Sequence, residues 1–442
     1  MTAVPDADGR GDVGGRWRSL ARALLVGAAR RAGQRGLAAA PDGSLGRGVA
    51  LRGIVWPGGD ATPYDGVVLV GPDGRIARIG PTASVPIPVG VRVIGAAHTW
   101  VGPGIVDAHV HLAVGPASGP ASGPASTGAF GAAEDALRGG VVGVRDLGAP
   151  RSVALRIRTG HRGPARGLPY VGVAGPILTA TGGYPSRSWG AAGFASSVTG
   201  PAQARLVVRG LAGDGVDVVK VAVERGPDGG WPVPPTAVLR AVVDAAHDAA
   251  LRVVAHALTA EAVGRVLDAG ADELAHTPAE RLPEPLVDRI AAAGVPVVST
   301  LQAFFSGGGG RAAAANAAAL HRAGVPLVYG TDLGNAGTRS GVDPRELDRL
   351  ADAGLGRLGA LRAATERSAA AAGVRLRTGR LELGDLAAAV LLNGDPLVEP
   401  GVWARPRAVV CDGRLLEPPE GSPDTLTEEP GVAGTLGDDR GR

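Results

Sequence analysis

Two histidines one residue apart are the first residues in this sequence whose spacing suggests chemistry. Residues 101–112 read VGPGIVDAHVHL, where a Pro-Gly pair precedes a short apolar run that ends in His109 and His111. Residues i and i+2 of a β-strand lie on the same face. A strand over residues 105–110 would therefore present both imidazoles to one ion. The pair predicts a metal site at this strand end, although the same spacing also occurs in ordinary polar surface.

Lys220 is the next residue of interest, because it is the only lysine among 45 Lys and Arg residues. It lies in VDVVKVAV, residues 216–223. Burying an unpaired ammonium among valines is costly, and arginine cannot supply a neutral amine. A neutral lysine amine can take up carbon dioxide to form a carbamate, whose two oxygens can bridge two metal ions. We interpret Lys220 as such a ligand. The alternative is a lysine that is ion-paired or extends to the surface.

Three further residues stand at the ends of apolar runs. His256 ends RVVAH, His276 ends ELAH, and Asp332 ends YGTD. Each histidine alone would more often be a packing residue, and Asp332 alone a helix N-cap. Together they complete a nitrogen and oxygen ligand set suited to zinc, with Asp332 placed to bind metal and hold a proton. We interpret the histidines away from strand ends as surface or helix residues: His98, His161, His247 and His321.

The middle of the chain supplies strands that can position these residues. Eight short apolar segments alternate with Ala-rich helical segments, at residues 105–110, 141–146, 170–173, 216–223, 252–256, 273–276, 296–300 and 326–329. Short, fully apolar runs are typical of parallel strands buried on both faces. Eight βα units over roughly 260 residues predict an α/β fold of the (β/α)8, or TIM, barrel type. The alternative, a doubly wound open sheet, lacks its Gly-rich phosphate turn after the first strand.

Strand-rich segments flank this middle part. The pattern predicts a small antiparallel sheet with strands at residues 67–70, 76–79 and 91–94. Similar strand-like segments occur again at residues 387–392, 408–410 and 414–416. We therefore expect one small β-domain built from both ends of the chain. The predicted division is a basic extension (1–48, disordered or loosely docked), the β-domain (49–103 and 376–417), the metal-binding barrel (104–375) and a disordered tail (418–442).

Composition excludes several classes of protein. A formal charge of +3 gives no indication of nucleic-acid binding, and no run approaches the roughly 20 apolar residues of a membrane span. The single cysteine, Cys411, excludes internal disulfides and fits the cytoplasm. Arg30 and Arg31 interrupt any signal peptide, so we interpret the N-terminal extension as solvated rather than as a membrane-surface helix. A homo-oligomer that acts on a small molecule is compatible with these features.

Two low-complexity stretches interrupt the alternating pattern. Residues 115–126 are three tandem Gly-Pro-Ala-Ser units, and residues 307–310 are four glycines. Both fall where the active-site loops of a barrel belong. We interpret them as neutral insertions, with a flexible lid as the alternative.

The combined pattern resembles the amidohydrolase superfamily, and within it the imidazolonepropionase/prolidase-like branch that carries a carboxylated lysine. The resemblance covers about residues 49–417. It rests on the six residues above and on VRDLG (144–148), GTDL (330–333), ALRAAT (360–365) and LLNGDPL (391–397). It implies a barrel with a small β-sandwich and a metal-dependent hydrolase.

The resemblance also implies a role for each residue. His109 and His111 would bind the more buried ion, His256 and His276 the second, and carbamylated Lys220 would bridge them. Asp332 would be a metal ligand and proton shuttle beside a metal-activated hydroxide. This is the pattern of a hydrolase acting on C–N bonds, peptide or other, in an amide, N-acyl or dipeptide-type substrate, with two divalent ions, zinc by expectation. The alternatives are a mononuclear cyclic-amide hydrolase or deaminase with unmodified Lys220, and a non-catalytic scaffold.

One departure from the family concerns the substrate. Relatives often carry a histidine after Thr-Gly-Gly beyond the third strand, where this chain has Tyr184. We expect Tyr184, Arg187 and Arg339, in the loops after the third and eighth strands, to bind a substrate carboxylate.

Overall fold

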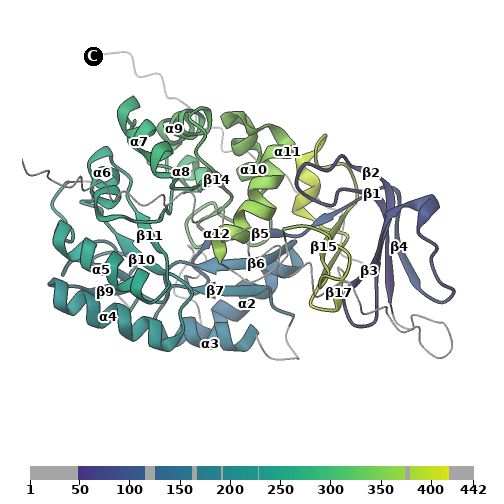
Figure 1. Ribbon diagram of the computed structural model, residues 1–442, viewed down its shortest axis with the longest axis horizontal. Helices are drawn as coiled ribbons and strands as arrows, with labels where there is room; N and C mark the ends of the chain where they lie inside the picture. The colour runs from purple at the N-terminus through teal and green to yellow at the C-terminus, as the bar shows by residue number, and fades with distance from the viewer. Residues whose placement is uncertain are drawn as a thin grey trace, which may run out of the picture.

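A computed structural model describes residues 48–114, 125–161, 167–190, 193–226, 228–373 and 379–417. The described chain is an α/β protein with three sheets. Figure 1 shows a largely antiparallel sheet at one end of the molecule and helix-covered parallel strands at the other. The predicted disordered tail, all but one residue of the N-terminal extension and most of the Gly-Pro-Ala-Ser repeat lie outside the described residues.

Both ends of the chain contribute to one seven-stranded sheet, of order β17-β16-β15-β4-β1-β2-β3. Its strands are β1 (Val49–Val55), β2 (Tyr64–Val70), β3 (Ile76–Pro81), β4 (Arg92–Pro103), β15 (Ala388–Leu392), β16 (Ala408–Cys411) and β17 (Arg414–Leu416). The two ends meet where β15 pairs antiparallel with β4. The expectation of an antiparallel sheet holds for β2 with β3 and for β15 with β4, but not for β1, which the pattern missed and which runs parallel to β4. That pair is formed by a long connection through β2 and β3 rather than by a hairpin.

The parallel strands form two sheets, of order β5-β6-β7 and β14-β13-β12-β11-β10-β8-β9. Each of the predicted apolar segments contains one strand: β5 (Ile105–Val110), β6 (Val141–Asp146), β7 (Tyr170–Val173), β10 (Val219–Ala222), β11 (Val253–His256), β12 (Glu273–Leu274), β13 (Val297–Val298) and β14 (Leu327–Val328). The strands β8 (Ile177–Thr179) and β9 (Ala195–Ser197) were not predicted, because three residues each are too few for a period-2 pattern.

Backbone hydrogen bonds connect the two parallel sheets at two places. The Ala108 amide on β5 donates to the Tyr329 carbonyl just after β14, at 3.1 Å. The Asp217 amide before β10 donates to the Val173 carbonyl of β7, at 2.9 Å. These two bonds link the three-stranded parallel sheet to the seven-stranded one.

Helices separate most of these strands along the chain. They are α2 (Ala125–Arg138), α3 (Arg151–His161), α4 (Pro201–Asp214), α5 (Thr236–Asp248), α6 (Ala260–Ala269), α7 (Glu284–Ala293), α8 (Leu301–Ser306), α9 (Gly310–Arg322), α10 (Pro344–Leu350), α11 (Gly356–Arg362) and α12 (Ser368–Ala372). Helix α6 shows how the sequence sets their ends: the Thr259 hydroxyl accepts from the Ala262 amide, and Gly270 ends the helix at φ 85°. Within the described ranges, no helix combines the length and apolar character that a membrane crossing requires.

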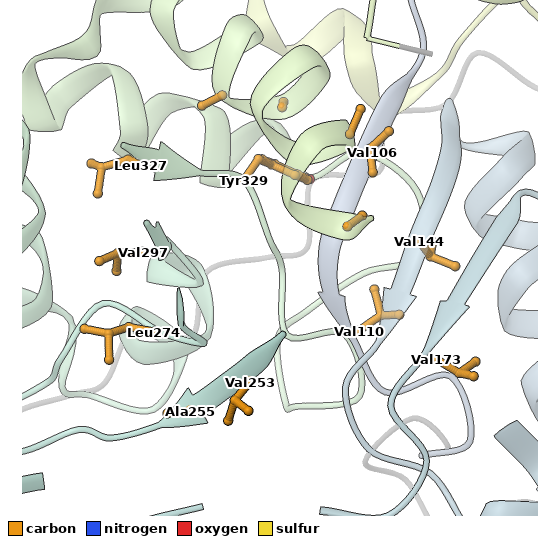
Figure 2. Close-up of a cluster of buried hydrophobic side chains, with 14 of the residues drawn as sticks. Val106, Val110, Val144, Val173, Val253, Ala255, Leu274, Val297, Leu327 and Tyr329 are labelled. Atoms are coloured by element: carbon orange, nitrogen blue, oxygen red, sulfur yellow. The ribbon is translucent and has the colours of Figure 1, made fainter. Parts of the chain in front are cut away.

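The parallel strands are buried on both faces, as their apolar runs predicted. Val253 and Ala255 of β11 join a large core cluster that includes Val242 of α5. Val254, between them, belongs to a separate small cluster with Val218 and Ala275. Figure 2 labels ten side chains of the large cluster, which come from β5, β6, β7, β11, β12, β13, β14 and the residue after β14. In β11, one face therefore packs against α5, and Val254, two residues before His256, belongs to the other face.

A shortened chain that begins at Arg47 is expected to keep its melting temperature and metal content. The pairing of β1 begins at Val49, opposite Val70 of β2, so the described sheet is complete without the extension. Thermal unfolding and elemental analysis of the full and shortened chains check this prediction. Loss of soluble protein on truncation would show instead that the extension packs on the core.

Candidate active site

The carboxylate of Asp107 fixes the strand end that carries the two neighbouring histidines. Its Oδ1 accepts from the backbone amides of His109 and Thr331, each at 3.1 Å, and its Oδ2 accepts from the Thr331 hydroxyl at 2.6 Å. Burial raises the pKa of Asp107 to about 7. Asp107 therefore ties the end of β5 to the loop that carries Asp332. The sequence analysis missed it, because its partner at residue 331 is distant along the chain.

The imidazoles of His109 and His111 converge through one nitrogen each. Their Nε2 atoms lie 3.3 Å apart. The Nδ1 of His109 lies 2.9 Å from the Ala275 carbonyl, and the Nδ1 of His111 lies 3.0 Å from the Gly148 carbonyl. A carbonyl only accepts, so we assign the proton of each ring to Nδ1. Two unprotonated Nε2 atoms at this separation repel each other, and a shared cation would relieve that repulsion.

Asp332 faces the same two nitrogens. Its Oδ1 lies 3.2 Å from Nε2 of His109 and 3.4 Å from Nε2 of His111. Its backbone amide donates to the His109 carbonyl at 2.9 Å, and its φ is 55°. A non-glycine residue in this left-handed region is strained, and such strain is characteristic of functional positions. The alternative role as a helix N-cap is wrong, because α10 begins at Pro344 and its N-cap is Asp343.

His276 completes a compact group with these residues. Candidate ligand atoms of His109, His276 and Asp332 all lie within 4.8 Å of one another. The Nδ1 of His276 also lies 3.0 Å from the Thr300 hydroxyl and 3.8 Å from Oδ2 of Asp332. Its ring centroid lies 4.6 Å from that of His109 and 4.8 Å from that of His256.

Lys220 and His256 each have a buried polar atom without a hydrogen-bond partner beside this group. Lys220 is 1% exposed, and neither its Nζ nor Nε2 of His256 has a hydrogen-bond partner among the described residues. A buried polar group left unpaired is costly, so such atoms are uncommon in folded proteins. The nearest carboxylate oxygen to Nε2 of His256 belongs to Glu224, at 3.9 Å. Nζ of Lys220 makes no hydrogen bond to a described carboxylate, although the charge of Asp332 partly opposes the lowering of its pKa by burial.

The electrostatics of the site favour neutral nitrogen ligands. Burial is the largest cause of a pKa well below the usual value for His109, His256 and His276. Burial likewise lowers the pKa of Lys220 to about 7. Neutral imidazoles present lone pairs, and an amine with such a pKa is largely neutral at physiological pH. Together with the unpartnered Nζ and Nε2 atoms, this donor set fits one or two divalent metal ions.

A small pocket opens onto these residues. Five of the six predicted ligands line it, and His109 is fully buried beside them. Of the three residues predicted to bind substrate, Tyr184 lines the pocket. Arg187 is exposed and outside the described lining, and Arg339 donates to the Ala404 carbonyl at 3.1 Å. The lining also includes Ile177, Trp189 and Asn335, which no sequence motif indicated.

A buried ion pair crosses the strands that carry the histidines. Arg145 of β6 and Glu273 of β12 are both fully buried and form two hydrogen bonds. Arg145 also donates to the carbonyl of Ala108, next to His109, at 2.8 Å and to that of Ala371 at 2.7 Å. Glu273 lies three residues before His276. The pair therefore braces two of the strand ends that position the site.

Comparison with known proteins places this geometry in a family. Residues 100–416 match the Amidohydrolase family model. An uncharacterized protein of Mycobacterium tuberculosis is 29% identical over 346 residues, which cover 72% of this chain and 86% of that protein. Among solved structures, a Xaa-Pro dipeptidase with bound methionine has a TM-score of 0.75 at 22% identity, over 84% of this chain and 100% of its own. A putative prolidase from Bifidobacterium longum has a TM-score of 0.72 at 25% identity, over 84% and 95%. Because the match takes in every residue of the site and most of the chain, this protein belongs to the amidohydrolase family.

Proposed function

We propose that this protein is a metal-dependent hydrolase of C–N bonds in amide, N-acyl or dipeptide-type substrates. The observation that carries the proposal is the convergence of unpartnered Nζ of Lys220 and Nε2 of His256 on the pocket that also receives Asp332. Family membership supports hydrolysis, and one similar structure is that of a Xaa-Pro dipeptidase. We infer a small-molecule substrate from family membership, and a cytoplasmic location from the single buried, free Cys411.

The proposal includes a finer description of the fold. We infer that the two parallel sheets close into one (β/α)8 barrel over residues 104–375, and that the seven-stranded sheet belongs to a β-sandwich of residues 49–103 and 376–417. The backbone bonds from Ala108 to Tyr329 and from Asp217 to Val173 support closure. Gly104 supports the boundary, because a Cβ there would lie 2.3 Å from Cγ1 of Val142. Such a close approach leaves room only for glycine between β4 and β5.

Within this proposal, each ligand has a physical reason for its place. His109 and His111 would hold one ion between nitrogens oriented by carbonyl groups. His256 and His276 would hold the second, and Lys220, carbamylated on its buried amine, would supply a ligand to both. Zinc suits such a nitrogen and oxygen set. When bound, the ions would lower the pKa of a water molecule and polarise the scissile carbonyl.

Asp332 is suited to moving the proton in this scheme. Its Oδ1 lies within 3.4 Å of Nε2 of His109 and of His111, and Asp332 lines the pocket. A carboxylate placed there can accept a proton from the attacking water and return it to the departing amine. The backbone amide of Asp332 donates a hydrogen bond to the His109 carbonyl, which holds the strained backbone of Asp332 in this position.

Replacement of Asp332 by asparagine is expected to lower turnover by about 100-fold or more, the scale of general acid–base catalysis. Asparagine has a similar shape but cannot carry the proton, so the fold is expected to stay nearly intact. Steady-state kinetics on an active substrate and the melting temperature of both proteins check this prediction. A variant with near-native turnover would remove Asp332 from the mechanism.

Metal analysis of the purified protein tests the proposal as a whole. Two divalent ions per chain are expected, with activity lost on chelation and restored by zinc. One ion per chain would favour a mononuclear cyclic-amide hydrolase or deaminase with unmodified Lys220. A chain that binds no metal, and hydrolyses none of the amide, N-acyl and dipeptide substrates, would be a non-catalytic scaffold.

A further inference from the structure

Thr300, two residues after β13, contacts one of the candidate ligands from a strained backbone. Its side chain is fully buried, and its hydroxyl oxygen lies 3.0 Å from Nδ1 of His276. Its backbone lies in the left-handed region, with φ 45° and ψ 30°. This region is unfavourable for a β-branched residue, and such strain persists only where the surrounding structure fixes it. The strain therefore directs attention to what this backbone does for the Thr300 side chain.

The Thr300 hydroxyl is not used as a threonine in this place ordinarily is. Thr300 directly precedes the first turn of α8, at the N-cap position. An N-cap threonine usually has an extended backbone, and its hydroxyl accepts from an amide of the first turn. Here the backbone is left-handed, and the hydroxyl makes no such bond to the described residues of that turn. The side chain is thereby left to face His276.

A carboxylate from another helix caps α8 instead. Glu346 of α10 is fully buried, and its two oxygens accept from the backbone amides of Leu301 and Gln302, at 3.0 and 2.6 Å. These are the first amides of α8, which lack partners within the helix. The Thr300 amide itself donates to the Gly330 carbonyl at 3.1 Å. Hydrogen bonds at Thr300 and just after it therefore fix its backbone.

The Thr300 hydroxyl bears on which nitrogen of His276 is available to a metal ion. Two oxygen atoms face Nδ1 of this ring, the Thr300 hydroxyl at 3.0 Å and Oδ2 of Asp332 at 3.8 Å. A carboxylate only accepts and a hydroxyl oxygen can accept, so we assign the ring proton to Nδ1. The lone pair is then on Nε2, as in His109 and His111, whose Nδ1 atoms lie against backbone carbonyls. Thr300 takes the place of such a carbonyl.

We propose that Thr300 is a positioning residue for His276 and that Glu346 keeps it in place. The hydroxyl would accept the Nδ1 proton, fix the orientation and tautomer of the ring, and leave Nε2 for the ion. This inference rests on the proposed function, because that function assigns His276 to a metal ion. Loss of a partner of this kind typically lowers metal affinity by about 10- to 100-fold.

Zinc titration of matched variants tests this inference. Thr300→Val keeps the shape and the branching at Cβ but removes the hydroxyl, and is expected to weaken zinc binding by about 10-fold or more. Thr300→Ser keeps the hydroxyl and is expected to bind zinc as the native protein does. The visible absorption of cobalt-substituted protein is a second readout, since it depends on ligand geometry. It is expected to change in Thr300→Val and to stay native in Thr300→Ser.

Thr365→Val is the matched control. Thr365 is also fully buried, but its hydroxyl donates to the Leu361 carbonyl, one turn earlier in its own helical segment, at 2.8 Å. Its loss is expected to leave zinc affinity and cobalt absorption unchanged. Glu346→Gln tests the second part of the inference, since the amide nitrogen of glutamine cannot accept from a backbone amide. It is expected to weaken zinc binding in the same direction as Thr300→Val.

The outcomes separate this inference from the proposed function. Native zinc affinity and native cobalt absorption in Thr300→Val would overturn the inference and leave the proposed function intact. Equal losses in Thr300→Val and Thr300→Ser would also overturn it, because the hydroxyl would then not be the group that acts. Weaker zinc binding in Thr300→Val alone, with no hydrolysis of any amide by the native protein, would support the positioning role and overturn the hydrolase. A native protein that binds no zinc would overturn both.

Discussion

Replacing Lys220 by arginine is expected to remove the second metal ion and nearly all activity. Arginine keeps a positive charge but stays protonated and cannot form a carbamate. In the strand β10 its guanidinium would lie where the bridging ligand is proposed, and it would repel both ions. The fold gives no other reason for lysine at this position, because Nζ has no hydrogen-bond partner among the described residues.

The reaction of the Lys220 amine with carbon dioxide explains why the burial of this side chain matters. Burial lowers the pKa of Lys220 to about 7, so a large fraction of the amine is neutral near physiological pH. A neutral amine adds to carbon dioxide and releases one proton, which gives an anion with two oxygens. The ions offset the desolvation of that anion among valines, and the anion offsets the repulsion between the ions. Metal and carbamate are therefore expected to be gained and lost together.

Elemental analysis and kcat/KM of the Lys220→Arg protein check the prediction. Lys220→Ala is the companion variant, since it empties the bridging position without adding charge. It is expected to be inactive, and short carboxylic acids in solution are expected to restore part of its activity by filling that position. If the arginine variant bound two ions and turned over normally, Lys220 would not be a bridging carbamate. The mononuclear alternative would then replace the proposed two-metal site.

The strands of the parallel sheets were predictable because their signal is local. Each is a short run of Val, Ile, Leu and Ala buried on both faces, and the candidate ligands follow at its end. A single lysine within such an apolar run, or an aspartate directly after the run, departs from the apolar pattern. Such a departure can be recognised without an alignment. The structure places these residues around one pocket. Their role as metal ligands remains a prediction.

The contacts that orient these residues had no local signal. Asp107 is paired with Thr331 across 224 positions, and Arg145 with Glu273 across 128. Nothing in the spacing of either residue indicates such a partner. The loops gave no local signal either. The direction of a long side chain such as Arg339 depends on the carbonyl to which it donates, so its distance from the pocket could not be predicted. The sequence therefore indicated which residues carry the chemistry, whereas the residues that position them came from the structure.

The second large effect, a loss of stability, is expected when the buried ion pair of Arg145 and Glu273 is broken. Both side chains are 0% exposed, so an unpaired partner would retain a desolvated charge. Breaking a buried pair by removing one partner typically lowers the free energy of unfolding by about 3–5 kcal/mol. Glu273→Ala is expected to reach this range, because Arg145 would keep only carbonyl partners and Arg252, 3.9 Å from Glu273, would lose the same counter-charge. Chemical denaturation at a fixed metal concentration measures the change, since metal binding itself shifts stability.

An exposed pair on the same protein provides the control. Glu261 and Arg225 form an ion pair at 3.0 Å on the surface, where solvent screens both charges. Glu261→Ala is expected to leave the free energy of unfolding nearly unchanged. A Glu273→Ala protein as stable as this control would show that Arg145 finds water or another partner when Glu273 is absent.

The Glu273→Ala variant also tests whether the buried ion pair positions the metal ligands. Arg145 holds the carbonyl of Ala108, and the next residue is His109, whose Nδ1 lies against the carbonyl of Ala275. Ala275 in turn lies between Glu273 and His276. Loss of Glu273 therefore loosens both strand ends that orient these imidazoles, and weaker orientation of metal ligands typically lowers metal affinity by 10- to 100-fold. A zinc titration of Glu273→Ala is expected to show weaker binding, whereas Glu261→Ala is expected to bind zinc as the native protein does. Unchanged zinc affinity in a destabilised Glu273→Ala protein would mean that the pair stabilises the fold without positioning the ligands.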